Sequence, residues 1–133
     1  MPRAVADTHT VIWYLYDDAR LSLAARTWIE DAAAAGEQIA ISTITLAEMI
    51  YLIEKGRIDA AALTRLMAAL DAADAVLVEV PFDRHVAQAM TRVARTEVPD
   101  LPDRIIAATA LHLGVPVISR DRKIQKSTLT TVW

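Results

Sequence analysis

The sequence predicts a three-layer α/β/α sandwich around a central parallel sheet of four or five strands. Short apolar segments alternate along the chain with segments of helical periodicity, and the apolar segments are continuous. Continuous apolar strands are typical of a parallel sheet that helices cover on both faces. A length of 133 residues and a hydrophobic content of 54% fit one domain spanning residues 1–133.

Periodicity and capping residues define the elements expected in the first half of the chain. Ser22 is a favourable N-cap, and Gly36 and Gly56 stand where helices would end. The expected elements are a strand at 3–6, a helix at 8–15, a helix at 23–35, a strand at 38–42 and a helix at 45–55.

In the second half, prolines and glycine set most of the expected boundaries. Asp59 is a favourable N-cap, Pro81 stops a strand, and Gly114 closes a helix. Two prolines predict a loop over 96–102. The expected elements are helices at 60–70, 83–95 and 103–113, strands at 75–80 and 115–119, and a possible fifth strand at 128–133.

Composition excludes several classes of site. The chain has no cysteine, which excludes disulfides, thiolate catalysis and Cys-ligated metals. Its three glycines are far apart, which excludes a Walker phosphate loop and a GxGxxG fingerprint. No secretory leader or membrane-length apolar run is evident, so we expect a cytoplasmic location. The net charge of −3 excludes bulk electrostatic coating of nucleic acid.

Four carboxylates are expected at one edge of the sheet. Asp7 directly follows the first strand, Asp121 follows the fourth, and Glu48 lies near the start of the helix after the second. Asp103 opens the helix that leads into the fourth strand, and that helix should run antiparallel to it. Ligand sites of parallel sheets lie beyond the carboxyl ends of the strands, where all four side chains would meet.

Clustered carboxylates repel one another, and no core requires such a cluster. Divalent cations would remove the repulsion, and hard oxygen ligands suit Mg²⁺ or Mn²⁺. Two ions held by carboxylates can hydrolyse a phosphodiester, one activating water and the other stabilising the leaving oxygen. The four residues therefore predict a metal-dependent phosphodiesterase site.

Each carboxylate also has a purely structural interpretation. Asp7 and Asp103 could cap the helices that follow them, and Asp121 could be a turn residue beside arginines. Glu48 has the spacing of a capping box with Thr45. These interpretations leave the common edge unexplained, and capping does not exclude metal binding.

The sequence around these carboxylates resembles the PIN domain (PilT N-terminus) family, of the single-domain kind found in VapC-type toxins. The resemblance runs from Val5 to about Ile124. Four blocks carry it in order: Asp7-Thr8-His9; Ile-Ser-Thr-Ile-Thr-Leu-Ala-Glu ending at Glu48; Asp-Arg-Ile-Ile-Ala-Ala-Thr-Ala beginning at Asp103; and Ile-Ser-Arg-Asp-Arg-Lys-Ile ending at Ile124. The block at Asp103 is the most specific. Ser119 stands where threonine is common, and Ile124 where an aromatic residue is common.

The resemblance implies a ribonuclease that uses Mg²⁺, with Mn²⁺ as a substitute. It assigns Asp7, Glu48, Asp103 and Asp121 to catalysis and metal binding, with Asp121 the least secure because this position is often outer-shell. Asp100 is close enough to Asp103 to replace it. Weaker substrate-binding candidates are Thr8, Ser119, Arg104, Arg120, Arg122 and Lys123; His9, adjacent to Asp7, could also approach substrate.

The resemblance also implies a VapB-type antitoxin as partner and RNA as substrate, and apolar first helices favour a homodimer. A catalytically inactive scaffold with the same fold remains an alternative. A phospho-receiver would need an aspartate after the third strand, where Val80-Pro81 stands. A haloacid-dehalogenase-type phosphatase would need Asp-x-Asp, and His9 occupies the second position.

Overall fold

The computed structural model describes residues 2–133. It contains a five-stranded sheet in the order β3-β2-β1-β4-β5, in which every neighbouring pair is parallel. The strands are β1 (Pro2–Ala6), β2 (Gln38–Ser42), β3 (Leu77–Val80), β4 (Val117–Ile118) and β5 (Thr131–Val132). This arrangement confirms the predicted sandwich, including the fifth strand.

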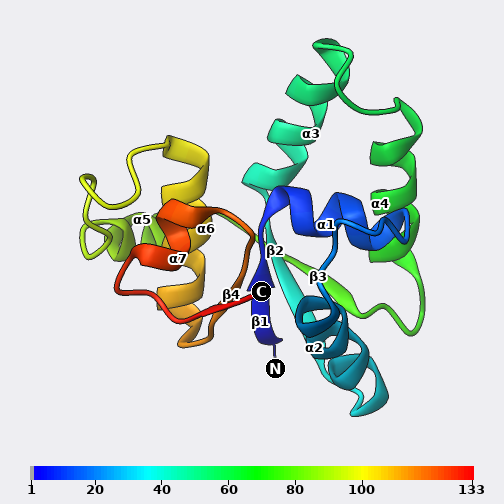
Figure 1. Ribbon diagram of the computed structural model, residues 1–133, viewed down its shortest axis with the longest axis horizontal. Helices are drawn as coiled ribbons and strands as arrows, with labels where there is room; N and C mark the ends of the chain where they lie inside the picture. Colours follow the sequence, from blue (N-terminus) through cyan, green and yellow to red (C-terminus); the bar gives the residue numbers. More distant parts are fainter. Residues whose placement is uncertain (1) are drawn as a thin grey trace.

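Helices cover both faces of the sheet, so the molecule has three layers (Figure 1). One side carries α1 (Thr8–Leu15), α2 (Leu23–Ala34), α3 (Ile44–Glu54) and α4 (Ala61–Asp71), and the other carries α5 (Arg84–Met90), α6 (Leu101–Leu113) and α7 (Arg122–Lys126). None of these helices, in the part of the chain described, is long and apolar enough to cross a membrane.

The sheet separates two hydrophobic cores, and the alternation along β1 shows how. Val5 belongs to the core beneath α5, α6 and α7, whereas Ala4 and Ala6 belong to the core beneath α1 to α4. Successive strand side chains point to opposite faces, so a strand buried on both faces must be apolar throughout. The continuous apolar runs in the sequence follow from this double burial.

Two helix boundaries differ from the sequence-based expectation. Helix α5 ends at Met90 instead of residue 95, and an Arg104 Nη atom donates to the carbonyls of Met90 and Val93 at 3.1 and 3.2 Å. Helix α6 begins at Leu101 instead of Asp103, because Asp100 is its N-cap and Pro102 fits the first turn. The segment between the two helices, 91–100, is therefore longer than the expected loop over 96–102.

The sequence analysis also missed α7 and extended β4 too far. Asp121 caps α7 by accepting hydrogen bonds from the backbone of Lys123 and Ile124 at 2.8 and 3.1 Å. Buried Ile124 anchors this short helix in the core beneath α5 and α6. Residues 122–126 thus form a short helix that the sequence analysis did not predict.

Because β1 is the central strand of the sheet and pairs with β4, the end of β1 lies beside the end of β4. The backbone N–H of Asp7 donates to the carbonyl of Ile118 at 3.1 Å, and the Thr10 hydroxyl donates to the same carbonyl at 3.0 Å. Both Asp7 and Thr10 are buried. The first turn of α1 is therefore fixed to the carboxyl end of a strand from the far end of the sequence.

Core packing predicts a large difference between two leucine substitutions. Leu66 on α4 is fully buried, whereas Leu23 at the start of α2 is 80% exposed. Leu66→Ala should lower the free energy of unfolding by about 2–5 kcal/mol through lost burial and a cavity. Leu23→Ala should change it by less than about 0.5 kcal/mol. Urea unfolding measures both, and similar losses would contradict the described core.

Candidate active site

A pocket of about 510 Å³ opens at the carboxyl edge of the sheet. It brings together the carboxylates predicted from four separate segments, and the structure adds Asp100 to them. Its lining residues are Asp7, Thr8, His9, Trp13, Glu48, Asp100, Asp103, Arg120 and Asp121. The predicted convergence is thus present in the fold.

Asp7 is the most rigidly held of these carboxylates. It is 8% exposed and caps α1, with one carboxylate oxygen accepting from the backbone of Thr10 at 2.9 Å. The buried Ser119 hydroxyl donates to its other oxygen at 2.5 Å. Ser119 also accepts from the backbone of Asp121 at 3.0 Å. The capping interpretation of Asp7 is confirmed, and Ser119 links Asp7 to the start of α7.

Glu48 is held by hydroxyl groups and not by a capping box. The Thr8 hydroxyl donates to Glu48 at 2.5 Å and lies 3.1 Å from the hydroxyl of buried Thr45. Thr45 is the second residue of α3, so the expected capping box with Glu48 is wrong. The position of Glu48 therefore depends on α1 as well as on its own helix.

Asp103 and Asp121 have different local roles. Asp100, rather than Asp103, caps α6, accepting from the backbone of Asp103 at 3.1 Å. The alternative interpretation, in which Asp103 caps its helix, is therefore wrong, and the Asp103 carboxylate lines the pocket. Asp121 caps α7, whereas its alternative interpretation was a turn residue.

The crowding of negative charge raises two pKa values in the pocket. The pKa of Asp103 rises to about 7, first because burial desolvates the carboxylate and then because Asp100, Asp121, Glu48 and Asp7 repel its charge. Desolvation also raises the pKa of Glu48, partly offset by the hydrogen bond from Thr8. Both shifts express an electrostatic cost of ionising this set of side chains together.

A hard divalent cation matches the chemistry of this pocket. Its acidic side chains offer oxygen donors alone, as Mg²⁺ prefers, and their repulsion is the cost that a cation would relieve. Among residues 2–133, however, no three His, Asp or Glu side chains are already arranged as metal ligands. Repulsion favours separation of the metal-free carboxylates, so ion binding would have to draw them together.

The predicted basic residues have three different placements. Arg120 lines the pocket, with its guanidinium carbon 5.7 Å from the centroid of the Trp13 ring. Arg122 and Lys123 lie exposed on α7. Arg104 bonds the carbonyls at the end of α5, which is a structural role that the substrate-binding expectation overlooked.

The pocket also contains side chains that the sequence analysis gave little weight. Trp13 is 7% exposed and packs in the core, but it also lines the pocket. His9, one helical turn earlier, is exposed there. Their spacing of four residues on a helix that begins at a site carboxylate could have indicated a shared face.

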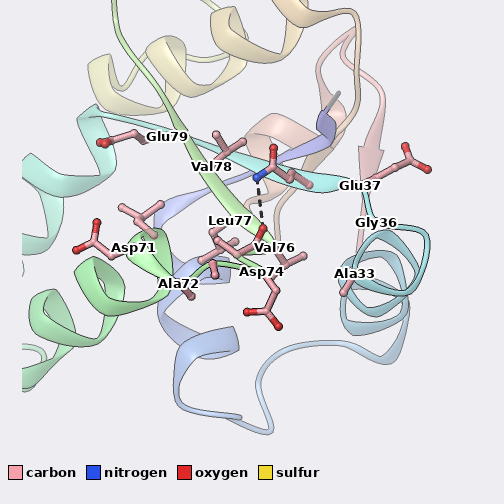
Figure 2. A pocket seen from close by; sticks show the side chains of 14 residues that line it. Ala33, Gly36, Glu37, Asp71, Ala72, Asp74, Val76, Leu77, Val78 and Glu79 are labelled. Carbon is pink, nitrogen blue, oxygen red and sulfur yellow. Dashed lines mark hydrogen bonds between the residues drawn. The ribbon is translucent and has the colours of Figure 1, made fainter.

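A second hollow of about 550 Å³ lies at the start of β3, between the ends of α2 and α4 (Figure 2). Glu37, Asp71, Asp74 and Glu79 are the acidic residues of its lining, and alanine, valine and leucine make up most of the rest. Arg3 pairs with Glu37 at 2.6 Å. In contrast to the pocket at the carboxyl edge, its described lining contains no hydroxyl or aromatic side chain.

Comparison with known proteins agrees with this fold. The family profile of the PIN domain matches residues 4–128, which is nearly the whole chain. The chain therefore belongs to the PIN domain family, and the resemblance seen in the sequence is confirmed.

Individual relatives are similar to the chain over nearly its whole length. The chain is 27% identical over 136 residues to Ribonuclease VapC22 of Mycobacterium tuberculosis, with all of both chains covered. A toxin–antitoxin complex from Klebsiella pneumoniae contains a chain with 26% identity and a TM-score of 0.66, covering 98% of this chain and 96% of that one. VapBC2 from Rickettsia felis, bound to a promoter DNA fragment, has the same fold at 19% identity, a TM-score of 0.70 and 96% coverage of each chain.

The raised pKa of Asp103 predicts that replacing this carboxylate with a neutral side chain stabilises the protein, by an amount that depends on pH. The folded pKa of about 7 exceeds the ordinary 3.8, so the folded state binds more protons than the unfolded state between these values. Stability of the metal-free protein should therefore fall as pH rises from about 4 to 7. Asp103→Asn should remove this loss and stabilise the protein at pH 8 by about 1–2 kcal/mol after solvent screening.

Urea unfolding of both proteins in EDTA, at pH 8 and pH 5, measures this difference. The gain in stability from Asp103→Asn should be much smaller at pH 5, where Asp103 is mostly protonated in the folded state. A gain that is equal at both pH values would contradict the charge-repulsion explanation. Asp83→Asn provides a control, because Asp83 caps α5 outside the pocket and asparagine also caps well.

Proposed function

We propose that this chain is a Mg²⁺- or Mn²⁺-dependent endoribonuclease and the toxin of a type II toxin–antitoxin pair that acts in the cytoplasm. The observation that carries the proposal is the convergence of Asp7, Glu48, Asp103 and Asp121 in one pocket. Membership of the PIN domain family and similarity to a ribonuclease across its whole length support it.

The divalent ions would be held by four carboxylates, those of Asp7, Glu48, Asp103 and Asp121. When bound, such ions supply Lewis acidity and activate water for attack on a phosphodiester. Ser119 keeps Asp7 oriented by donating to one of its oxygens, and Thr8 does the same for Glu48. Because both hydroxyls are buried and bonded, they restrict the orientation of Asp7 and Glu48 before an ion draws the carboxylates together.

Arg120 is the basic side chain best placed to contact the substrate, since it lines the pocket among carboxylates. RNA with unpaired nucleotides fits a small concave site better than a duplex, whose base edges such a pocket cannot read. We therefore assign Arg120 to a phosphate near the scissile bond and a single-stranded or looped RNA to the pocket.

A VapB-type antitoxin is the proposed partner, supported by the toxin–antitoxin complex from Klebsiella pneumoniae. An antitoxin segment could insert a basic side chain into the acidic pocket and exclude the metal ions. The proposed homodimer would use apolar surface that the monomer leaves exposed, such as Ile50 and Tyr51 on α3 and Met67 on α4.

The ribonuclease proposal predicts that cleavage requires both the ions and the carboxylates. Cleavage of total RNA with Mn²⁺ should disappear in EDTA, and Asp7→Asn or Asp103→Asn should lower its rate at least about 100-fold while the protein remains folded. Sequencing of RNA ends measures cleavage, and circular dichroism checks the fold. Asp83→Asn should cleave like the parent protein.

Two outcomes would reject this assignment. Activity in EDTA equal to that with Mn²⁺ would exclude the metal role of the pocket. Absence of Mn²⁺ binding by calorimetry at millimolar concentration, together with absence of cleavage, would instead favour an inactive scaffold with the same fold.

The proposed mode of inhibition predicts competition between partner and metal. Calorimetric binding of Mn²⁺ to the free chain should be lost, or weakened at least about tenfold, in the purified complex with its antitoxin. Gel filtration with light scattering establishes which assembly is titrated and tests the homodimer. Equal Mn²⁺ affinity of the free chain and the complex would show that the partner leaves the pocket open.

A further inference from the structure

Part of the pocket lining is aromatic and cationic, in contrast to the carboxylates. This part of the lining consists of His9, Trp13 and Arg120. The proposed metal chemistry concerns phosphates and water and makes no use of aromatic rings. These side chains therefore require an explanation that the carboxylates do not supply.

Trp13 is a fixed support within this lining. Arg20 and Arg120 place their guanidinium carbons 5.2 and 5.7 Å from the centroid of its ring, and the Trp133 ring lies at 5.7 Å. Cations over an aromatic ring are attracted to its electron density. With a side chain that is 7% exposed, Trp13 acts on the pocket by positioning its neighbours.

His9 is the neighbour with a free surface. Its ring centroid lies 5.7 Å from that of Trp13 at an interplanar angle of 51°, yet His9 as a whole is exposed. It is close enough to Glu48 for their charges to interact. An aromatic ring is thus supported from within the protein and open to solvent inside the acidic pocket.

The geometry points to a nucleobase-binding subsite: the exposed ring of His9, supported by Trp13, stacks against an unpaired base of the RNA, while Arg120 contacts a neighbouring phosphate. This inference rests on the proposed function, because it names how the same pocket selects its substrate. Unpaired bases stack on aromatic side chains and on arginine planes in proteins that bind single strands.

The size of the pocket fits this division of roles. A volume of about 510 Å³ falls within the ~300–1,000 Å³ typical of sites for small organic ligands. Such a site has room for a base as well as a phosphate. Because stacking follows the area of the ring systems, a purine should bind more tightly than a pyrimidine at this position.

Binding of two short RNAs tests the subsite separately from cleavage. The Asp103→Asn protein, in Mg²⁺, serves as a parent that does not cut its ligand under the proposed function. The probes are fluorescently labelled pentaadenylate and an abasic ribose-phosphate pentamer of equal charge. Fluorescence anisotropy measures the affinity of the parent and of variants carrying His9→Ala, His9→Phe or, as a matched control, His112→Ala.

Stacking predicts that His9→Ala weakens pentaadenylate binding about five- to tenfold and leaves the abasic pentamer unaffected. His9→Phe should restore affinity to within about twofold of the parent, since phenylalanine keeps the flat ring. His112 lies outside the pocket and faces the ring of His85 at 6.3 Å, so its replacement should change neither affinity.

Three results would overturn the subsite. An equal loss of affinity for both probes in His9→Ala would assign His9 to the RNA backbone. Unchanged affinity for pentaadenylate in His9→Ala would exclude stacking. Failure of the parent to bind pentaadenylate also rejects the inference. The ribonuclease proposal is judged independently by cleavage of total RNA by the wild-type chain, so the two can fail separately.

Discussion

Parallel pairing of β1 with both of its neighbours is the constraint on which the pocket depends. Because β1, β2 and β4 run in the same direction, their carboxyl ends meet at one edge. This pairing puts Asp7 within hydrogen-bonding distance of Ser119, 112 residues away in the sequence. Thr8 contacts Glu48 across the other side of the same strand end. Loss of either pairing would separate the carboxylates without changing any of them.

The sequence was sufficient to predict the sandwich and the convergence of the carboxylates, because strand polarity determines both. It was insufficient where a distant side chain decides a local structure. The end of α5 depends on Arg104, which belongs to another helix, and α7 depends on the burial of Ile124. The nearby Asp100 also has the capping role that the structural interpretation gave to Asp103. His9 and Trp13 joined the site because α1 turns one face toward it, which composition does not reveal.

Helix capping and the pocket share the same side chains, which reduces the electrostatic cost of assembling them. Asp7, Asp100 and Asp121 accept backbone N–H groups at the starts of α1, α6 and α7. Such hydrogen bonds satisfy backbone N–H groups of the first helical turn, and helix N-termini carry partial positive charge that attracts a carboxylate. Asp103 lies in the first turn of α6 without being its cap, and its pKa carries the remaining repulsion. Stability and function are therefore opposed most directly at Asp103.

The central place of β1 has a consequence for the order in which the molecule assembles during synthesis. Ser119, which follows β4, leaves the ribosome 112 residues after Asp7, which follows β1. Contacts between such distant segments form late, after the intervening chain is available. A nascent chain that has not yet released β4 therefore lacks one wall of the pocket, and the site stays incomplete until β4 has joined the sheet.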